Sequence, residues 1–222
     1  MDVPAWQSLK RLGLEGWTGV RAVADVDRDA TEVLTEHPLN GKFSGWSRDG
    51  RQSFWPERGW ILTPAMSTTE TLARMVDYGG REFGPCMTAF TNELGGRVVV
   101  LGYFPWTQVH SLAKSSQLKA VCTWLSSGRL PVVAESFSKT VIWCRRAEDG
   151  RNNFVLLNAS LDRLDSLALR IRTERGEFTH FQPDRKPQSL TSEPVPSLAG
   201  YVRVVMHDLE PWSVHLLTNR FE

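Results

Sequence analysis

Residues 83–101 have the sequence FGPCMTAFTNELGGRVVVL, in which two apolar runs flank a short polar segment that ends in two glycines. The second run, Arg97–Leu101, is rich in β-branched residues, which favour strands. Gly95 and Gly96 can adopt the positive φ that a tight reversal requires. The stretch therefore predicts a β-hairpin in which Phe83–Phe90 pairs with Arg97–Leu101.

A helix is expected on each side of this hairpin. Ser67-Thr68-Thr69-Glu70 matches a capping box. Apolar residues follow it at helical spacing until Gly79-Gly80 ends the segment: Leu72, Met75 and Val76. The second helix is expected over Ser111–Ser126, where apolar residues again recur at helical spacing: Leu118, Val121, Cys122 and Leu125. Residues 1–130 thus mix helices, loops and strands.

Short strands are expected after Leu130-Pro131. Six runs of strand character are separated by turn signals such as Asp149-Gly150. They are Lys139–Arg146, Asn153–Asn158, Leu167–Thr173, Glu177–Gln182, Tyr201–Met206 and Val214–Thr218. The proline-rich stretch Pro183–Pro196 is interpreted as a connecting loop. Residues 131–222 therefore predict a small antiparallel β-sandwich.

Composition excludes several classes of protein. The 222 residues are 41% hydrophobic and 23% charged, with a net charge of +1, so neither a nucleic acid nor an acidic membrane surface is an expected partner. The N-terminus lacks a basic start and an apolar run, and no apolar run approaches the about 20 residues of a spanning helix. We therefore expect a cytoplasmic protein. A (β/α)8 barrel takes about 250 residues, so the chain is too short for one.

Few residues carry a recognisable chemistry. The three cysteines are widely spaced and the five histidines form no ligand pattern, so we expect reduced thiols and neither a metal nor a cofactor. Cys86 lies inside an expected strand rather than at a strand-to-helix turn, which disfavours a nucleophile. Glu82 and Glu93 flank the same strand, but nothing marks them as a catalytic pair.

Two loops combine arginine, aromatic and polar residues. One is His37–Lys42 and the other is Arg48–Pro56. Such residues are typical of a subunit or domain interface, and they also suit a sugar site or a loop held by local ion pairs. The candidate interface or ligand residues are His37, Asn40, Arg48, Arg51, Trp46, Trp55 and Trp60. Exposed apolar surface is expected among Trp17, Trp46, Trp55 and Trp60.

Three stretches resemble the C-terminal region of large bacterial glycoside-hydrolase-like proteins related to family 42 β-galactosidases: Glu36–Gly41, Arg51–Trp55 and Asn92–Trp106. The closing stretch Leu209–Leu217 resembles the last strand of glycosidase C-terminal sandwiches. The resemblance implies a multi-part α+β fold: a truncated α/β layer like that of glutamine amidotransferases and flavodoxins over residues 1–130, then a β-sandwich over residues 131–222. It also implies that the two catalytic glutamates belong to a barrel that this chain does not contain.

The expected function is therefore a non-catalytic accessory or assembly region of a carbohydrate-active enzyme. Its expected partners are a catalytic barrel domain or subunit, a second copy of the chain, and a carbohydrate. One alternative is a carbohydrate-binding module, although Trp143 lies on an alternating strand whose apolar face should be buried. The other is a free-standing glycoside hydrolase that uses Cys86 or a carboxylate such as Glu93.

Overall fold

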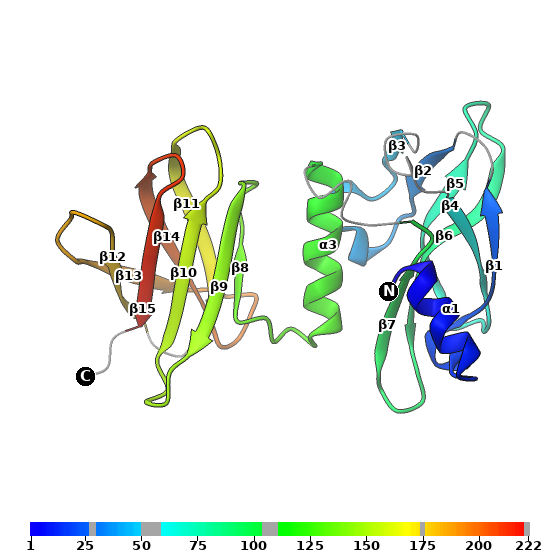
Figure 1. Ribbon diagram of the computed structural model, residues 1–222, viewed down its shortest axis with the longest axis horizontal. Coiled ribbons are helices and arrows are strands. Elements are labelled where there is room, and N and C mark those ends of the chain that lie inside the picture. Colours follow the sequence, from blue (N-terminus) through cyan, green and yellow to red (C-terminus); the bar gives the residue numbers. More distant parts are fainter. Residues whose placement is uncertain (27–29, 50–58, 104–110, 174–175, 220–222) are drawn as a thin grey trace. The chain divides into compact units, whose positions relative to one another are not determined.

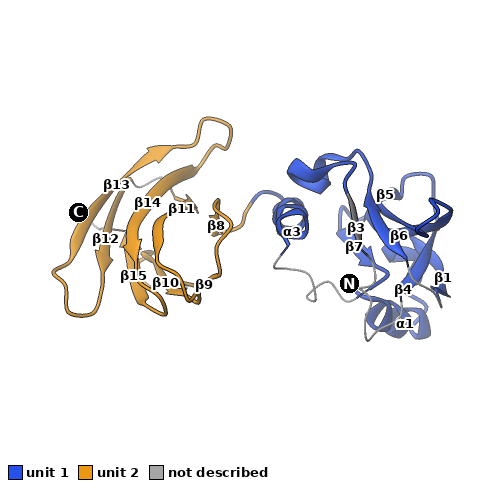
Figure 2. Ribbon diagram, turned by 90° about the horizontal axis from the view of Figure 1, so that it is seen from above, with its two compact units in different colours: residues 1–128 blue, residues 129–222 orange. Residues whose placement is uncertain are grey.

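The structure is a computed structural model that describes residues 1–26, 30–49, 59–103, 111–173 and 176–219. The chain divides into two compact units, Met1–Gly128 and Arg129–Glu222 (Figure 2). Strands dominate both units (Figure 1). None of the described helices combines the length and the apolar composition that a membrane-crossing segment needs.

The expected α/β layer in the first half is wrong, because unit 1 is built on antiparallel strands. Its larger sheet has the order β3-β2-β5-β6-β7. The bounds, in that order, are Ser47–Asp49, Thr31–Leu34, Glu70–Val76, Glu82–Thr91 and Arg97–Leu101. A second sheet pairs β1 (Val20–Val26) with β4 (Gly59–Pro64). An amidotransferase-like layer needs parallel strands joined by helices, and every strand pair described in unit 1 is antiparallel.

The segment expected to form the helix after Ser67 is strand β5 instead. β5 pairs with β2 on one side and with β6 on the other, and Leu72 and Met75 are fully buried. The hydroxyl of Thr69 donates to the carbonyl of Gly19 across 2.9 Å rather than capping a helix. Long-range pairing on both edges has thus overridden a local helix signal. The glycine pair makes the turn into β6, with Gly80 at φ 85°.

The hairpin at residues 83–101 is confirmed. β6 and β7 pair from Met87–Leu101 to Thr91–Arg97, and Gly95 has φ 77° in the turn. The backbone continues to Gly102, which lies between two strands: its N–H donates to the carbonyl of Cys86, and its carbonyl accepts from the N–H of Trp60, both across 2.7 Å. Gly102 thus joins β4 to β6.

The second expected helix is confirmed as α3 (Leu112–Leu125), with the Ser111 hydroxyl accepting from the N–H of Lys114. Its buried residues are Lys114, Gln117 and Val121, so the inward face is largely polar. Leu125 is 40% exposed instead. The other helices in the described part of the chain are short: α1 (Val3–Arg11), η1 (Glu15–Thr18) and η2 (Pro38–Phe43).

Unit 2 is one antiparallel sheet of eight strands, in the order β8-β11-β14-β13-β12-β15-β10-β9. Strands β8 to β11 span Val132–Ala134, Thr140–Arg146, Asn152–Asn158 and Leu164–Arg172. Strands β12 to β15 span Glu177–Phe181, Gln188–Pro194, Tyr201–Leu209 and Val214–Asn219. The sheet curls around a single core to which both of its ends contribute, so it is nearly closed and barrel-like rather than two separate sheets.

The proline-rich stretch contains β13, so its interpretation as a connecting loop is wrong. Residues 188–191 pair with β12, whereas residues 192–194 pair with β14. The first half of β13 thus pairs with one neighbouring strand and the second half with the other, so β13 connects β12 to β14 in the sheet. Pro194 stands at the end of the strand, where the missing N–H is tolerated.

Candidate functional site

Two predicted site residues, His37 and Asn40, hold η2 against the sheet. His37 Nε2 lies 2.8 Å from Glu70 Oε2, and its Nδ1 accepts from the N–H of Leu39. Asn40 is fully buried, and its amide nitrogen donates to the carbonyls of Thr35 and Leu72. Both side chains are thus occupied within unit 1, and the expectation that they contact a ligand or partner stays a prediction.

The remaining predicted residues do not form one cluster in the described structure. Trp46 is 59% exposed and meets Phe43 edge-on, with ring centroids 5.0 Å apart. Trp60 is partly buried on β4, against a small core that includes Leu62. Arg48 lies on β3, but its side chain is not described, and Arg51 and Trp55 fall outside the described residues.

A buried polar cluster that the sequence did not suggest joins α3 to the sheet of unit 1. Lys114 Nζ lies 3.3 Å from Glu32 Oε1, and it also donates to the Tyr103 hydroxyl and to Gln117 Oε1. Gln117 in turn donates to Asn40 Oδ1 across 2.7 Å. These groups satisfy one another, so the cluster's evident role is to orient α3. A pocket of about 300 Å³, lined also by Trp46, adjoins it.

The groups considered for catalysis are poorly placed for it. Cys86 is fully buried in β6, away from any solvent that a substrate would share. Glu82 is the first residue of the ten-residue strand β6 and Glu93 lies just past its other end, so at about 3.3 Å per residue the two are separated by roughly 30 Å. A glycosidase needs its two carboxyl groups about 5–10 Å apart. Glu82 and Glu93 therefore do not form a catalytic pair.

A group of exposed apolar side chains lies on neighbouring strands of unit 2. Trp143 on β9 stands opposite Val155 on β10, Val155 opposite Leu216 on β15, and Leu216 opposite Phe181 on β12. Facing residues on neighbouring antiparallel strands project from the same side of a sheet, so these four side chains form a continuous row. They are between 36% and 52% exposed.

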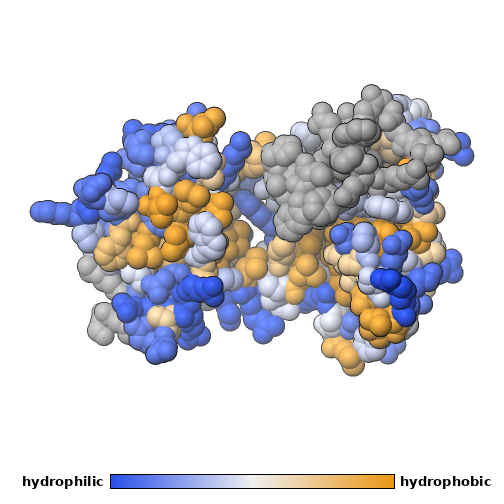
Figure 3. All heavy atoms as spheres, in the orientation of Figure 1, coloured by the Kyte–Doolittle hydropathy of each residue, from blue (hydrophilic) through white to orange (hydrophobic). Residues whose placement is uncertain are grey.

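A second row runs beside the first. Val141 on β9 and Val214 on β15 both stand opposite Leu157 on β10, and they are 42% and 46% exposed. We call the exposed members of the two rows the outer apolar face: Val141, Trp143, Val155, Phe181, Val214 and Leu216. Figure 3 shows hydrophobic residues gathered over β9, β10 and β15 on the side of unit 2 toward the viewer.

This face corrects the expectation that the apolar side of β9, with Trp143, would be buried. Ile142 and Cys144 point to the core instead, and Trp143 points outward. The signal was present in the sequence. Val141–Cys144 and Phe154–Leu157 are apolar at every position, whereas an antiparallel strand with one wet face alternates. Such runs are typical of a sheet covered on both faces.

A pair of buried histidines lies on the inner side of the same strands. His180 Nε2 and Gln182 Nε2 lie 2.9 and 3.0 Å from His215 Nδ1, and the Ser213 hydroxyl lies 2.7 Å from His215 Nε2. Burial, and then the charges of His180 and Arg185, lower the pKa of His215 to about 4. The pair is neutral at physiological pH and belongs to the structural core.

Comparison with known proteins shows a likeness of fold at low sequence identity. No protein-family model and no curated protein sequence matches the chain. Among solved structures, α-L-fucosidase isoenzyme 2 from Paenibacillus thiaminolyticus has a similar fold, with a TM-score of 0.56 and 14% sequence identity. The match covers 90% of this chain and 34% of the fucosidase chain. The chain thus spans about a third of that protein, and the specific likeness to family 42 β-galactosidases stays a prediction.

Proposed function

We propose that the chain is a non-catalytic accessory and assembly region of a carbohydrate-active protein. Its outer apolar face packs against a catalytic domain, which lies either in the same polypeptide or in a separate subunit. The observation that carries this proposal is the outer apolar face itself. Contiguous apolar patches with a polar rim mark interaction sites on soluble proteins, whereas scattered apolar residues do not.

The chemistry of the face favours a protein as its occupant. Trp143 and Phe181 stand at the two ends of a row whose middle members, Val155 and Leu216, are aliphatic. An aromatic anchor among aliphatic side chains is typical of the centre of a protein interface. A catalytic domain is the proposed partner because the fucosidase of similar fold, a glycoside hydrolase, is about three times as long as the region that matches.

A carbohydrate platform on the same face is the second candidate. Trp143 and Trp212 are 52% and 60% exposed, so the aromatic side chains that this function requires are accessible. Sugar rings stack on aromatic faces, however, and the four aliphatic members of the outer apolar face offer neither a ring nor a hydrogen bond. The interface is therefore the better-supported use of the face.

The proposal is tested by the association state of the chain in solution. An uncovered apolar face should drive concentration-dependent self-association, measured by sedimentation velocity, and Trp143→Glu should abolish it by placing a charge in the row. Trp17→Glu is the matched control, because Trp17 is 43% exposed but lies on η1 of unit 1.

Two results would contradict the interface. A chain that stays monomeric at high concentration and binds no apolar dye would show that the face needs no cover. Binding of neutral oligosaccharides that disappears in Trp143→Ala would assign the face to sugar instead.

A further inference from the structure

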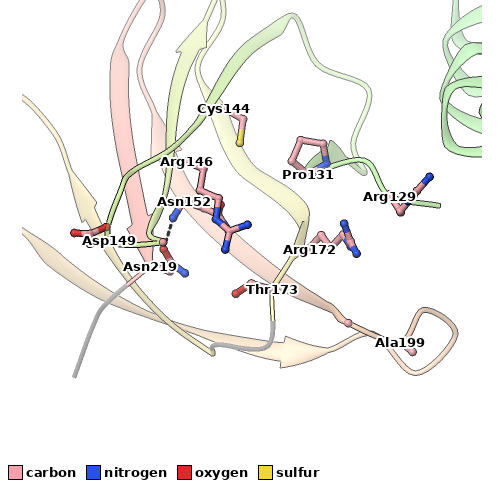
Figure 4. A pocket seen from close by; sticks show the side chains of 12 residues that line it. Arg129, Pro131, Cys144, Arg146, Asp149, Asn152, Arg172, Thr173, Ala199 and Asn219 are labelled. Carbon is pink, nitrogen blue, oxygen red and sulfur yellow. Dashed lines mark hydrogen bonds between the residues drawn. The ribbon is translucent and has the colours of Figure 1, made fainter. Parts of the chain in front are cut away.

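A hollow of about 760 Å³ opens at one end of the curled sheet of unit 2 (Figure 4). Its walls come from the ends of β9, β11 and β15 and from the starts of β10 and β14. These strands include both ends of the sheet order, so the hollow exists because the sheet curls back on itself. Its volume falls within the range of about 300–1,000 Å³ that is typical of small-molecule sites.

Positive charge is concentrated at this hollow. Arg129, Arg146 and Arg172 line it together with one carboxylate, that of Asp149. Asp149 Oδ2 already accepts from Arg151 Nε across 2.7 Å, so its charge is engaged elsewhere. The lining residues that the structure describes therefore carry an excess of two positive charges, in a chain whose net charge is only +1.

Two of the arginines are not held by the protein. Figure 4 shows Arg146 on β9 and Arg172 on β11 extending over the hollow, with Arg129 farther out. Among the residues that the structure describes, the guanidinium groups of Arg146 and Arg172 form no hydrogen bond and no ion pair, although the backbone N–H of Arg172 donates to the carbonyl of Pro131. Like charges that share a partly enclosed site repel one another, and a bound anion removes that cost.

The other groups in the lining are suited to hydroxyls. Asn219 is 3% exposed, and its Oδ1 accepts from the N–H of Asn152 across 2.7 Å. The side-chain amide nitrogen of Asn219 is therefore the group that can donate to a ligand hydroxyl. The Thr173 side chain adds a hydroxyl. Burial raises the pKa of the Cys144 thiol, so that group adds no negative charge at neutral pH. Among the described lining residues, none is aromatic.

We propose that this hollow binds an anionic saccharide, with its carboxylate or sulfate group between Arg146 and Arg172 and its hydroxyls toward Asn219 and Thr173. Guanidinium groups bind oxyanions in a two-point geometry, which favours such a group over a neutral sugar. The absence of an aromatic lining disfavours a nucleobase or another flat ligand. The proposal is independent of the outer apolar face, which uses the opposite side of β9.

Isothermal titration calorimetry on the whole chain tests this site with four ligands: digalacturonate, a sulfated galactose disaccharide, the matching neutral disaccharide, and inorganic sulfate. An acidic disaccharide should bind more tightly than the neutral one and than free sulfate, and added salt should weaken it. Whichever acidic disaccharide binds identifies the anionic group.

Arg146→Gln and Arg172→Gln should each weaken that binding about tenfold or more. Arg145→Gln should leave it unchanged, because Arg145 is the next residue on β9 and projects from the other face. The proposal is overturned if no acidic disaccharide binds at low salt, or if inorganic sulfate binds as tightly as either acidic disaccharide. It is also overturned if Arg146→Gln and Arg172→Gln weaken binding no more than Arg145→Gln does.

Discussion

The protonation state of His215 makes the stability of unit 2 depend on pH. His180 Nε2 and Gln182 Nε2 lie 2.9 and 3.0 Å from its Nδ1, and the Ser213 hydroxyl, which donates to the carbonyl of Glu210, lies 2.7 Å from its Nε2. With Nδ1 as the acceptor and Nε2–H as the donor, these contacts suit the neutral ring, which burial also favours. The unfolded chain has no such restraint, and its histidines titrate near 6.5.

Unit 2 is therefore expected to lose stability in acid. The pKa of His215 is about 4 in the folded state, so the unfolded state gains the proton first as the pH falls below about 6.5. The free energy of unfolding should decrease between about pH 6.5 and pH 4, by about 2–3 kcal/mol from this residue, and then level off. Urea unfolding at a series of pH values measures the loss.

Two histidine substitutions test whether the buried pair of His180 and His215 causes this loss of stability. His215→Gln should flatten the acid limb of the stability curve, whereas His207→Gln should not, because His207 is exposed on β14. A wild-type curve that is flat between pH 6.5 and pH 4, or one that His207→Gln flattens equally, would contradict the assignment.

Among the described glycines of unit 1, Gly102 leaves the least room for an added side chain. A Cβ at this position would overlap the carbonyl oxygen of Trp60 and would lie 3.2 Å from that of Cys86. Both contacts are with backbone, which cannot swing aside. Gly102→Ala should therefore push β4 away from β6 and destabilise unit 1 by about 3 kcal/mol or more.

The matched control for this substitution is Gly16→Ala. A Cβ at Gly16 meets nothing within 4 Å, and its φ is not positive, so chemical unfolding should show a change below about 0.5 kcal/mol. Equal effects of the two substitutions would show that β4 and β6 separate without cost.

At the scale of elements, α3 shows what a buried ion pair does in this fold. Lys114 and Glu32 are 1% and 0% exposed as side chains. Removing one charge leaves the other buried without compensation, so Lys114→Met should destabilise unit 1 by about 3–5 kcal/mol. The double variant Lys114→Met/Glu32→Gln should recover part of this loss, because no charge then remains buried at the pair. Urea unfolding of Lys114→Met, Glu32→Gln and the double variant measures the coupling, and additive effects would show that the pair is not coupled.

Elements with strong local signals could be predicted from the sequence. The hairpin around Gly95 and α3 were found because turn chemistry and capping are properties of a few neighbouring residues. β5 was not, because the spacing of three between Leu72 and Met75 fits a helix, and only pairing with β2 and β6, with irregular register along β6, selects the strand. The inward face of α3 was missed for a related reason: Lys114 is buried by partners far away in sequence.

The candidate site depends still more on long-range structure. The predicted residues came mainly from loops rich in arginine and tryptophan, whereas the outer apolar face assembles six residues from four strands. The register that aligns Trp143 with Phe181 cannot be predicted from either strand alone. Arg146 and Arg172 meet only because β9 and β11 lie near opposite ends of a sheet that curls.

At the scale of the whole molecule, the chain has separate cores. The two apolar clusters of unit 1 centre on residues such as Met75 and Trp6, and the cluster of unit 2 contains Phe154 and Leu169. No described cluster draws on both units. A core that is complete within one unit can unfold as its own cooperative step.

Two transitions are therefore expected in calorimetry, and the substitutions above assign them. Lys114→Met should lower the melting temperature of one transition and leave the other in place, whereas a shift from pH 7 to pH 5 should act mainly on the transition that Lys114→Met leaves unchanged. A single transition that both changes move together would contradict this expectation, because it would mean that the two units unfold as one cooperative body.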